Sequence, residues 1–402
     1  MTTAPAALAD LIGEDAAQAI VRFRRDLHQH PEIGMDTVET AKKIEDAVRA
    51  LSPDALKRFA GTGLAVLFKG AAPCPTPRPM IGFRADMDAL PAPDESGAPY
   101  ASKNGCAHLC GHDGHSAALL AFAHWLADNR AEYGGDVLLI FQPGEEGYAG
   151  AKKMIDDGLL ETFDLREVFA VHGDPEVPLG SIKFRKGAMT ASASLAKIVV
   201  EGLGGHGSTP HEAIDPVPAA AELVLAMQTI ISRSADPQEA GVVSLTSMHC
   251  GDLKAPSVIP ARVSLAGTIR TFDGALEDRI EARMRAICEG IAMAHGVRIS
   301  LEYERLYPVD VNNPALVDAV TETVAGVFGK EKLLTDVKPY TVAEDFAFFS
   351  AVRPSVLFFL GLGDEEHAAK LHNPHFDFND RALGLWVRLF ASIARSRLPR
   401  QA

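Results

Sequence analysis

The feature that most constrains the fold is an alternation of strand-like and helix-like segments that stops near residue 190 and resumes after residue 305. Before the break, apolar strand patterns such as "GLAVLFKG" and "GDVLLIF" alternate with helical spacing such as "TVETAKKIEDAVRAL". This alternation predicts an α/β fold, with a mostly parallel sheet that carries helices on both faces.

Between the two stretches the order changes to strand, helix, strand, strand, helix, strand, beginning with "LAKIVVEG" and ending with "RISLEYERLYP". That order is typical of a split βαβ, or ferredoxin-like, sandwich. We therefore predict one α/β domain formed by residues 1–189 and 306–402, interrupted by a smaller domain of residues 190–305.

Charge and cysteine content exclude several classes of protein. The formal net charge of −14 argues against a surface for nucleic acid or anionic membrane, because such a surface needs excess Lys and Arg. We expect no transmembrane helix, since no run of about 18 apolar residues occurs. The first residues lack the basic segment of a signal peptide. Five irregularly spaced cysteines indicate reduced thiols and a cytoplasmic location rather than a disulfide framework.

The stretch "CAHLCGHDGHS" holds a dense set of potential metal ligands. Cys110 and His112 lie on a loop that leads into a predicted helix, and thiolate and imidazole are strong ligands for ions such as zinc. Any one of these side chains alone is more simply a buried structural residue. Several of them on one loop are hard to explain by packing, so the cluster favours a metal site.

Further candidate ligands follow predicted strands. "FQPGEEG" places Glu145 and Glu146 in a glycine-flanked turn, His172 ends the strand of "FAVHGDP", and His372 lies in "KLHNPHFDF". Ligands in open α/β sheets bind beyond the carboxyl ends of the strands. In "GFRADMD", Asp86 and Asp88 could bind a metal or orient a ligand imidazole.

The candidate ligands are too many for one metal ion. A single ion takes three or four protein ligands, so two metals with a shared ligand are the natural count for this set: Cys110, His112, Glu146, His172 and His372. Glu145 then stays free as a general base for water, and the reaction class is hydrolysis of an amide or related acyl bond.

The inserted domain contains "EGLGGHGSTPH", which matches the G-x-G-x-x-G pattern. A dinucleotide fold would need a helix beginning at the last glycine, but a proline-containing stretch intervenes. We interpret the loop instead as a carrier of His206, which could hold an oxyanion. On the strand "LAGTIRT", Arg270 either clamps a substrate carboxylate or pairs with a neighbouring acid.

In order along the chain, the motifs resemble those of the dinuclear metallo-amidohydrolases, the group of hippurate hydrolases, N-acyl-amino-acid amidohydrolases and auxin–amino-acid conjugate hydrolases. The resemblance spans about residues 20 to 385 and is carried by "DLHQHPEIG", "FRADMDALP", "HLCGHDGHSA", "QPGEEG", "GGHGSTPH", "GTIRT", "AEDFAFF" and "LHNPHFDF".

The resemblance implies a metallopeptidase-type catalytic domain with a mixed sheet flanked by helices, the five ligands above, and Glu145 as general acid and base. It also implies two divalent ions drawn from Zn, Mn, Co or Ni, and a homodimer formed by the inserted domain, with His206 reaching the partner's active site and Arg270 binding the substrate carboxylate. Where the family usually has Asn before "VIP", this chain has Ser257, a smaller substrate contact. We assign Asp88 and Asp113 to orienting the ligands.

The sequence therefore predicts an enzyme that cleaves N-acyl amino acids, a small-molecule substrate, to a carboxylate and a free amino acid. Two alternatives stay open. A dipeptidase or carboxypeptidase would use the same metal centre, and a non-catalytic metal-binding or metabolite-binding protein could be built on the same scaffold.

Overall fold

The computed structural model describes residues 8–400, and these form two compact units. The first unit contains the described residues up to Met189 together with 311–338 and those from Asp345 onward. The second contains 190–310 and 339–344. The N-terminal stretch for which we predict no signal peptide begins in residues 1–7, which lie outside the described residues.

The first unit is built on a mixed sheet of eight strands. In spatial order the strands are β1 (Ala55–Phe59), β2 (Gly63–Lys69), β4 (Asp136–Gln142), β3 (Met80–Asp86), β5 (Glu167–Pro178), β16 (Ser355–Gly363), β6 (Ile182–Lys183) and β15 (Leu333–Leu334). The α/β fold class is confirmed, and so is the mixed sheet that the resemblance implies, because β1, β2 and β6 each pair with a neighbour in the antiparallel sense.

The central strands β4, β3, β5 and β16 are all parallel, so their carboxyl ends meet at one edge of the sheet. The chain passes from β3 to β4 on one side and then returns to β5 on the other side of β3. Such a reversal of strand order leaves a crevice at the carboxyl edge, which is where α/β proteins bind their ligands.

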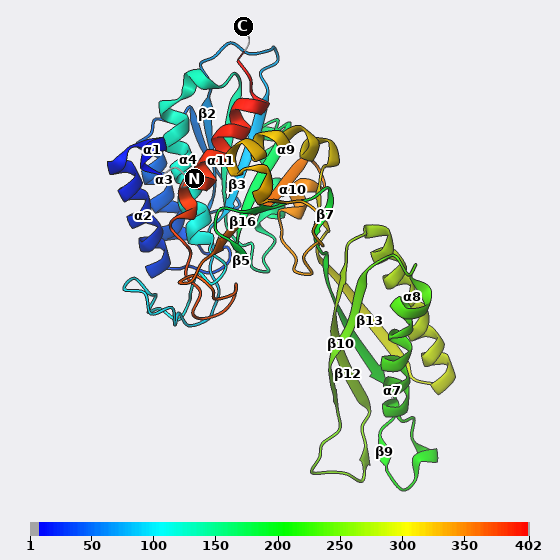
Figure 1. Cartoon of the computed structure of the whole chain (residues 1–402). Coiled ribbons are helices and arrows are strands. Elements are labelled where there is room, and N and C mark those ends of the chain that lie inside the picture. The colour runs from blue at the N-terminus through cyan, green and yellow to red at the C-terminus, as the bar shows by residue number, and fades with distance from the viewer. Residues whose placement is uncertain (1–7, 401–402) are drawn as a thin grey trace. The chain divides into compact units, whose positions relative to one another are not determined.

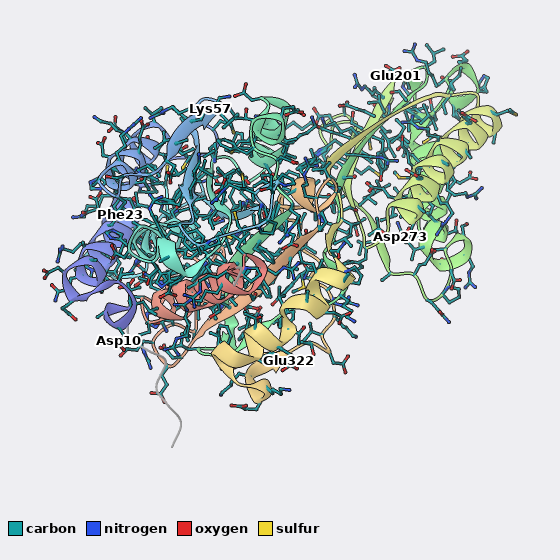
Figure 2. All side chains as sticks on the ribbon, turned by 90° about the horizontal axis from the view of Figure 1, so that it is seen from above. Asp10, Phe23, Lys57, Glu201, Asp273 and Glu322 are labelled. Atoms are coloured by element: carbon teal, nitrogen blue, oxygen red, sulfur yellow. The ribbon has the colours of Figure 1, made fainter. Side chains whose placement is uncertain are left out.

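Helices cover both faces of this sheet. Phe83 of β3 contacts one helical layer, with ring centroids 4.9 Å from Phe122 and 4.6 Å from Phe390. Figure 1 shows α2, α4 and α11 together in this layer, and Figure 2 shows the side chains that fill the first unit, with Glu322 at its outer surface. The helices of this unit are α1 (Ala9–Ile12), α2 (Glu14–Gln29), α3 (Val38–Arg49), α4 (His112–Asp128), α5 (Gly150–Asp156), α6 (Leu159–Thr162), α9 (Pro314–Phe328), α10 (Ala347–Ser350) and α11 (Ala382–Arg397).

Helix α4 begins earlier than the sequence predicts. We expected it to follow the Cys and His cluster, but Gly111 has φ of 86° and the helix begins at His112, inside the cluster. Glycine adopts this left-handed conformation without the steric cost that a side chain brings. The early start places Asp113 and His115 on the first, buried turn of a helix rather than on a loop.

The second unit has the predicted order of elements. Its four-stranded antiparallel sheet has the order β10-β12-β8-β13, and the helices α7 and α8 pack on one face. Alternate residues of β8, among them Ile198 and Val200, are buried, as expected for a sheet with one covered face. Its elements are β8 (Ala193–Glu201), β9 (Gly205–His206), α7 (Pro216–Met227), β10 (Gly241–Cys250), β11 (Val258–Ile259), β12 (Arg262–Thr271), α8 (Gly274–His295) and β13 (Arg298–Tyr307).

Residues 339–344 belong to the second unit although they lie far along the chain from its other residues. The Ala191 amide donates hydrogen bonds to the carbonyl oxygens of Tyr340 and Val342, which ties this short segment to the start of the unit. A separate ladder joins β7 (Gly187–Thr190) and β14 (Asp310–Asn312). Within residues 8–400, no helix is long and apolar enough to cross a membrane.

The packing at the start of α4 predicts the effect of a single methyl group. A Cβ at Gly114 would lie 2.3 Å from Phe378 Cδ2, and Phe378 is fully buried. Gly114→Ala is therefore expected to lower the free energy of unfolding by about 1–3 kcal/mol in urea titrations, as overpacking does. Gly290→Ala in α8 is the matched control, because nothing lies within 4 Å and the substitution should be neutral or slightly stabilising. Equal stability of the two variants would contradict this packing argument.

Candidate functional site

The six side chains that we predict as metal ligands and general base all lie in the first unit, at the carboxyl edge of the sheet. Cys110 and His112 come from the loop and first residue of α4, Glu145 and Glu146 from the turn after β4, and His172 from β5. His372 comes from the segment between β16 and α11. The ligand atoms of these side chains form overlapping groups, within each of which all atoms lie within 4.8 Å of one another.

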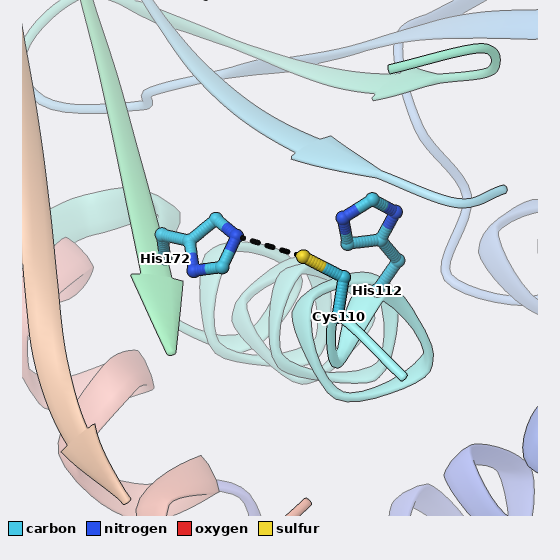
Figure 3. A group of neighbouring side chains, drawn as sticks. All are labelled: Cys110, His112 and His172. Atoms are coloured by element: carbon cyan, nitrogen blue, oxygen red, sulfur yellow. Dashed lines mark hydrogen bonds between the residues drawn. The ribbon is translucent and has the colours of Figure 1, made fainter. Parts of the chain in front are cut away.

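The first group consists of Cys110, His112 and His172, all of them buried. Figure 3 shows the thiol of Cys110 between the two imidazoles, with Sγ 3.4 Å from His172 Nε2. The Nδ1 atom of His172 lies 2.8 Å from the carbonyl oxygen of Gly173, so that Nδ1 donates and Nε2 faces the thiol with a lone pair. One soft thiolate and two imidazoles are a suitable ligand set for zinc, cobalt or nickel.

The second group shares Cys110 with the first and adds Glu146 and His372. His372 Nε2 lies 3.3 Å from Glu146 Oε1. The backbone of His372 has φ of 62°, which is uncommon for a residue other than glycine, and its amide donates to the carbonyl oxygen of Leu109 at 2.8 Å. This backbone bond joins the His372 segment directly to the Cys110 loop.

The turn of Glu145 and Glu146 is held by Asp88. The two carboxylate oxygens of Asp88 accept the amides of Glu145 at 3.0 Å and Glu146 at 3.2 Å. The carbonyl oxygen of Asp88 also lies 2.9 Å from His112 Nδ1, which leaves His112 Nε2 to face the cluster. Asp88 thus fixes the backbone of Glu145 and Glu146 and the ring of His112.

The charges and the unsatisfied atoms of the cluster fit a bound cation. His112 Nε2 is buried without a hydrogen-bond partner in the described structure, and an unpaired buried nitrogen is costly unless something binds it. Burial lowers the pKa of His112, but Asp86 and Asp88 raise it by more, to about 10. Positive charge is therefore favoured at this buried position, as it must be where a metal ion is held.

A second network lies behind the cluster and contains Asp113. The Asp113 carboxylate accepts from His28 Nδ1 at 2.9 Å and from Arg24 Nη1 at 3.3 Å. Arg24 is fully buried and also binds Asp377 at 2.8 Å and Asp380 at 2.9 Å. Arg24 therefore joins the first turn of α4 to the segment that follows His372.

Sequence reasoning missed several of these supporting residues. His28 lies in "DLHQHPEIG", Arg24 lies two residues before that motif, and Asp345 lies in "AEDFAFF". We predicted no role for any of them. Arg84 also went without a role, yet it is buried and binds Asp86 at 2.7 Å and Asp345 at 2.8 Å. A basic residue two positions before Asp86 on a buried strand was the only local signal.

We predicted that His172 ends its strand, and this prediction is wrong. Strand β5 stays paired with β16 beyond His172, with Asp174 opposite Gly361, and runs to Pro178. The prediction failed because the acidic, proline-containing stretch "GDPE" is typical of a turn, whereas in the structure it belongs to strand β5, which stays paired with β16.

The second unit carries the remaining predicted residues. His206 lies on β9 opposite Val258 of β11, and its Nδ1 accepts from the amide of Ser208 at 3.1 Å. Ser257 is exposed beside this ladder, and its carbonyl oxygen accepts the Gly207 amide at 2.7 Å. Arg270 lies on β12, where its guanidinium donates to the Ile269 carbonyl oxygen at 2.9 Å.

Comparison with known proteins identifies the family. Residues 82–396 match the model of peptidase family M20/M25/M40, and the chain belongs to this family. It is 37% identical over 378 residues to a hippurate hydrolase of Campylobacter jejuni, covering 93% of this chain and 95% of the relative. It is 34% identical over 381 residues to an N-acetylcysteine deacetylase of Bacillus subtilis, covering 93% and 96%.

A solved structure agrees with these relatives. A dinuclear metal-binding peptidase of the M20 family from Bacillus subtilis superposes with a TM-score of 0.82 at 30% identity, covering 96% of this chain and 99% of that one. The resemblance that we inferred from the motifs is therefore confirmed, as is the fold class. The protein is a hydrolase of amide C–N bonds.

His28 gives the stability of the protein a pH dependence of defined sign. Burial lowers the pKa of His28, but the Asp113 carboxylate raises it by more, to about 9 from an ordinary 6.5. Because the folded-state pKa is raised, the stabilisation is fully present below pH 6.5 and is lost as the pH rises through 9. The loss of unfolding free energy caused by His28→Gln, measured by urea unfolding in metal-free buffer, should therefore be largest near pH 6.5 and shrink towards pH 9.

His30→Gln is the matched control for this measurement, since His30 is exposed in the same part of the chain. It should leave stability nearly unchanged at every pH. A His28→Gln effect that stayed constant from pH 6.5 to 9 would contradict the charge that we assign to His28.

Proposed function

We propose that this enzyme uses two divalent metal ions to cleave N-acyl amino acids to a carboxylate and a free amino acid. One observation carries the proposal: distant segments bring a thiolate, three imidazoles and a carboxylate into two groups that share Cys110, with Glu145 beside them. The named activities of the hippurate hydrolase and N-acetylcysteine deacetylase relatives support the N-acyl substrate class.

The two groups suggest how the ions would be held. Cys110, His112 and His172 would bind one, and Cys110, Glu146 and His372 the other. When bound, a pair of divalent ions lowers the pKa of water and stabilises the oxygens of a tetrahedral intermediate. The identity of the metal among Zn, Mn, Co and Ni depends on supply as well as on the thiolate, which favours the softer ions.

Glu145 is suited to the proton transfers of the reaction. Its side chain is largely buried, and one of its carboxylate oxygens lies within 4.8 Å of the ligand atoms of His112 and Glu146. With Glu146 and His112 assigned to the metal, the Glu145 carboxylate takes the proton of the attacking water and passes it to the leaving nitrogen. The amide of Glu145 is fixed by Asp88, which holds the base in place.

We assign roles in substrate binding to residues of the second unit. Arg270 is half-buried, and burial lowers its pKa. Within residues 8–400, no carboxylate forms a salt bridge with its guanidinium, so it can clamp the carboxylate of an amino-acid product. We assign His206, reaching the active site of a partner subunit, to the oxyanion, and Ser257 to a substrate contact. A homodimer through this unit and a cytoplasmic location stay predictions.

The Glu145→Gln variant tests whether Glu145 acts as the general base rather than as a metal ligand. This substitution removes the proton acceptor but keeps the side-chain volume, so kcat is expected to fall by about 10²–10⁴ while metal content stays at the wild-type level. Glu146→Gln is the matched control one residue away, and it should lower the metal content, measured by plasma mass spectrometry. Substantial turnover by Glu145→Gln at full metal content would contradict the assignment of the base.

A comparison of substrates tests the substrate class. On metal-reconstituted enzyme, kcat/KM for an N-acetyl amino acid should exceed kcat/KM for the dipeptide in which a glycyl group replaces the acetyl group. The reason is that a dipeptidase needs a pocket for the free amine, whereas an aminoacylase does not. Chelator-stripped enzyme should be inactive on both. A preference for the dipeptide would favour the peptidase alternative, and no turnover of either by loaded enzyme would favour the non-catalytic one.

A further inference from the structure

Strands β3 and β5 separate at the edge of the candidate site. They pair from Ile81 opposite Glu167 to Arg84 opposite Ala170, and no further. Strand β5 continues past this point on its other side, where Gly173 is opposite Leu360 of β16. The amide of Gly173, next to His172, therefore has no backbone partner on β3.

His115 occupies the gap between the two strand ends. It lies on the first turn of α4 and is fully buried. Its Nδ1 is 2.6 Å from Asp86 Oδ1 at the end of β3, and its Nε2 accepts the Gly173 amide at 3.0 Å. Since Nε2 accepts, the ring proton is on Nδ1 and is donated to Asp86. One neutral imidazole thus links the ends of β3 and β5 where the two strands no longer form backbone hydrogen bonds with each other.

Both ends of this bridge are themselves fixed. Asp86 is held by Arg84 at 2.7 Å, and its carbonyl oxygen accepts the hydroxyl of Ser116 at 2.7 Å. At the other end, the carbonyl oxygen of Gly173 accepts from Nδ1 of His172 at 2.8 Å. The bridge therefore ends on the residue that determines which nitrogen of His172 faces Cys110.

We propose that His115 is a positioning residue, which holds the ends of β3 and β5 so that His172 and Cys110 can bind the same cation. This inference rests on the proposed metal site. His115 is not itself a ligand, because both of its ring nitrogens are engaged by Asp86 and Gly173. Although Asp86, His112 and His115 are close enough to hold an ion, the Asp86 carboxylate is already bound by Arg84 and His115.

The test is a titration of the metal-free protein with Co²⁺, followed by the absorption band of Co²⁺-bound thiolate. His115→Phe keeps a ring in the space but removes both hydrogen bonds. We expect its affinity for Co²⁺ to fall by about 10–100-fold, as for other residues that orient metal-binding histidines, with a weaker thiolate band. A folded His115→Phe variant with the wild-type affinity and band would overturn the proposal.

A conservative variant separates positioning from packing. The amide of His115→Gln carries an NH₂ group that donates and a carbonyl oxygen that accepts, so it should restore most of the affinity that His115→Phe loses. His124→Gln, on the same helix but only partly buried, is the matched control and should bind Co²⁺ as the wild type does. Equal losses in His115→Gln and His115→Phe would contradict the assignment of the loss to the two hydrogen bonds of His115.

Hydrogen exchange in the wild type keeps the test decisive even if His115→Phe does not fold. The Gly173 amide should exchange slowly although no strand pairs with it on the β3 side, and rapid exchange there would refute the bridge. His172→Ala distinguishes the two proposals. If the wild type shows no thiolate band, or if His172→Ala leaves Co²⁺ binding intact, the metal site fails. If His172→Ala weakens binding but His115→Phe does not, only the role of His115 fails.

Discussion

Buried negative charge at the carboxyl ends of β3 and β4 is the constraint on which the site depends. Asp86 and Asp88 are fully buried, and Glu145 is nearly so. An ionised carboxylate out of water is tolerated only where cations or hydrogen-bond donors compensate it. Arg84 compensates Asp86, and backbone amides compensate Asp88. The negative charge of Asp86, Asp88 and Glu146 favours positive charge at His112, which is where the ligand atoms of the cluster converge.

The supporting residues act by fixing backbone as much as by fixing side chains. Asp88 holds the Glu145 and Glu146 turn by its amides, His115 holds the Gly173 amide, and the His372 amide bonds to the Cys110 loop. Ligands that come from segments far apart in sequence can form one site only if each segment is held against its neighbour. Orientation of this kind is worth about one to two orders of magnitude in metal affinity in other proteins.

Several candidate metal ligands could be proposed from the sequence, whereas most of the residues that hold their segments in place could not. Cys110, His112 and the Glu145–Glu146 pair stood out because several ligand-type residues occurred together beside strand and helix patterns. Arg24 did not stand out, because its partners Asp377 and Asp380 lie more than 350 residues away in the sequence. Nothing in the local pattern of a buried arginine on an amphipathic helix distinguishes it from one on a solvated face.

Periodicity and residue type are local properties, so the α/β class, the order of elements in the second unit and a set of candidate metal ligands could be predicted from the sequence. The sequence did not predict that α4 begins at His112, that β5 continues beyond His172, or that His115 bridges two strands rather than binding metal. These outcomes depend on which groups meet across the sheet. A hydrogen bond or ion pair between distant segments leaves no periodic trace in the chain, because its free energy comes from the removal of both partners from water after the segments have come together.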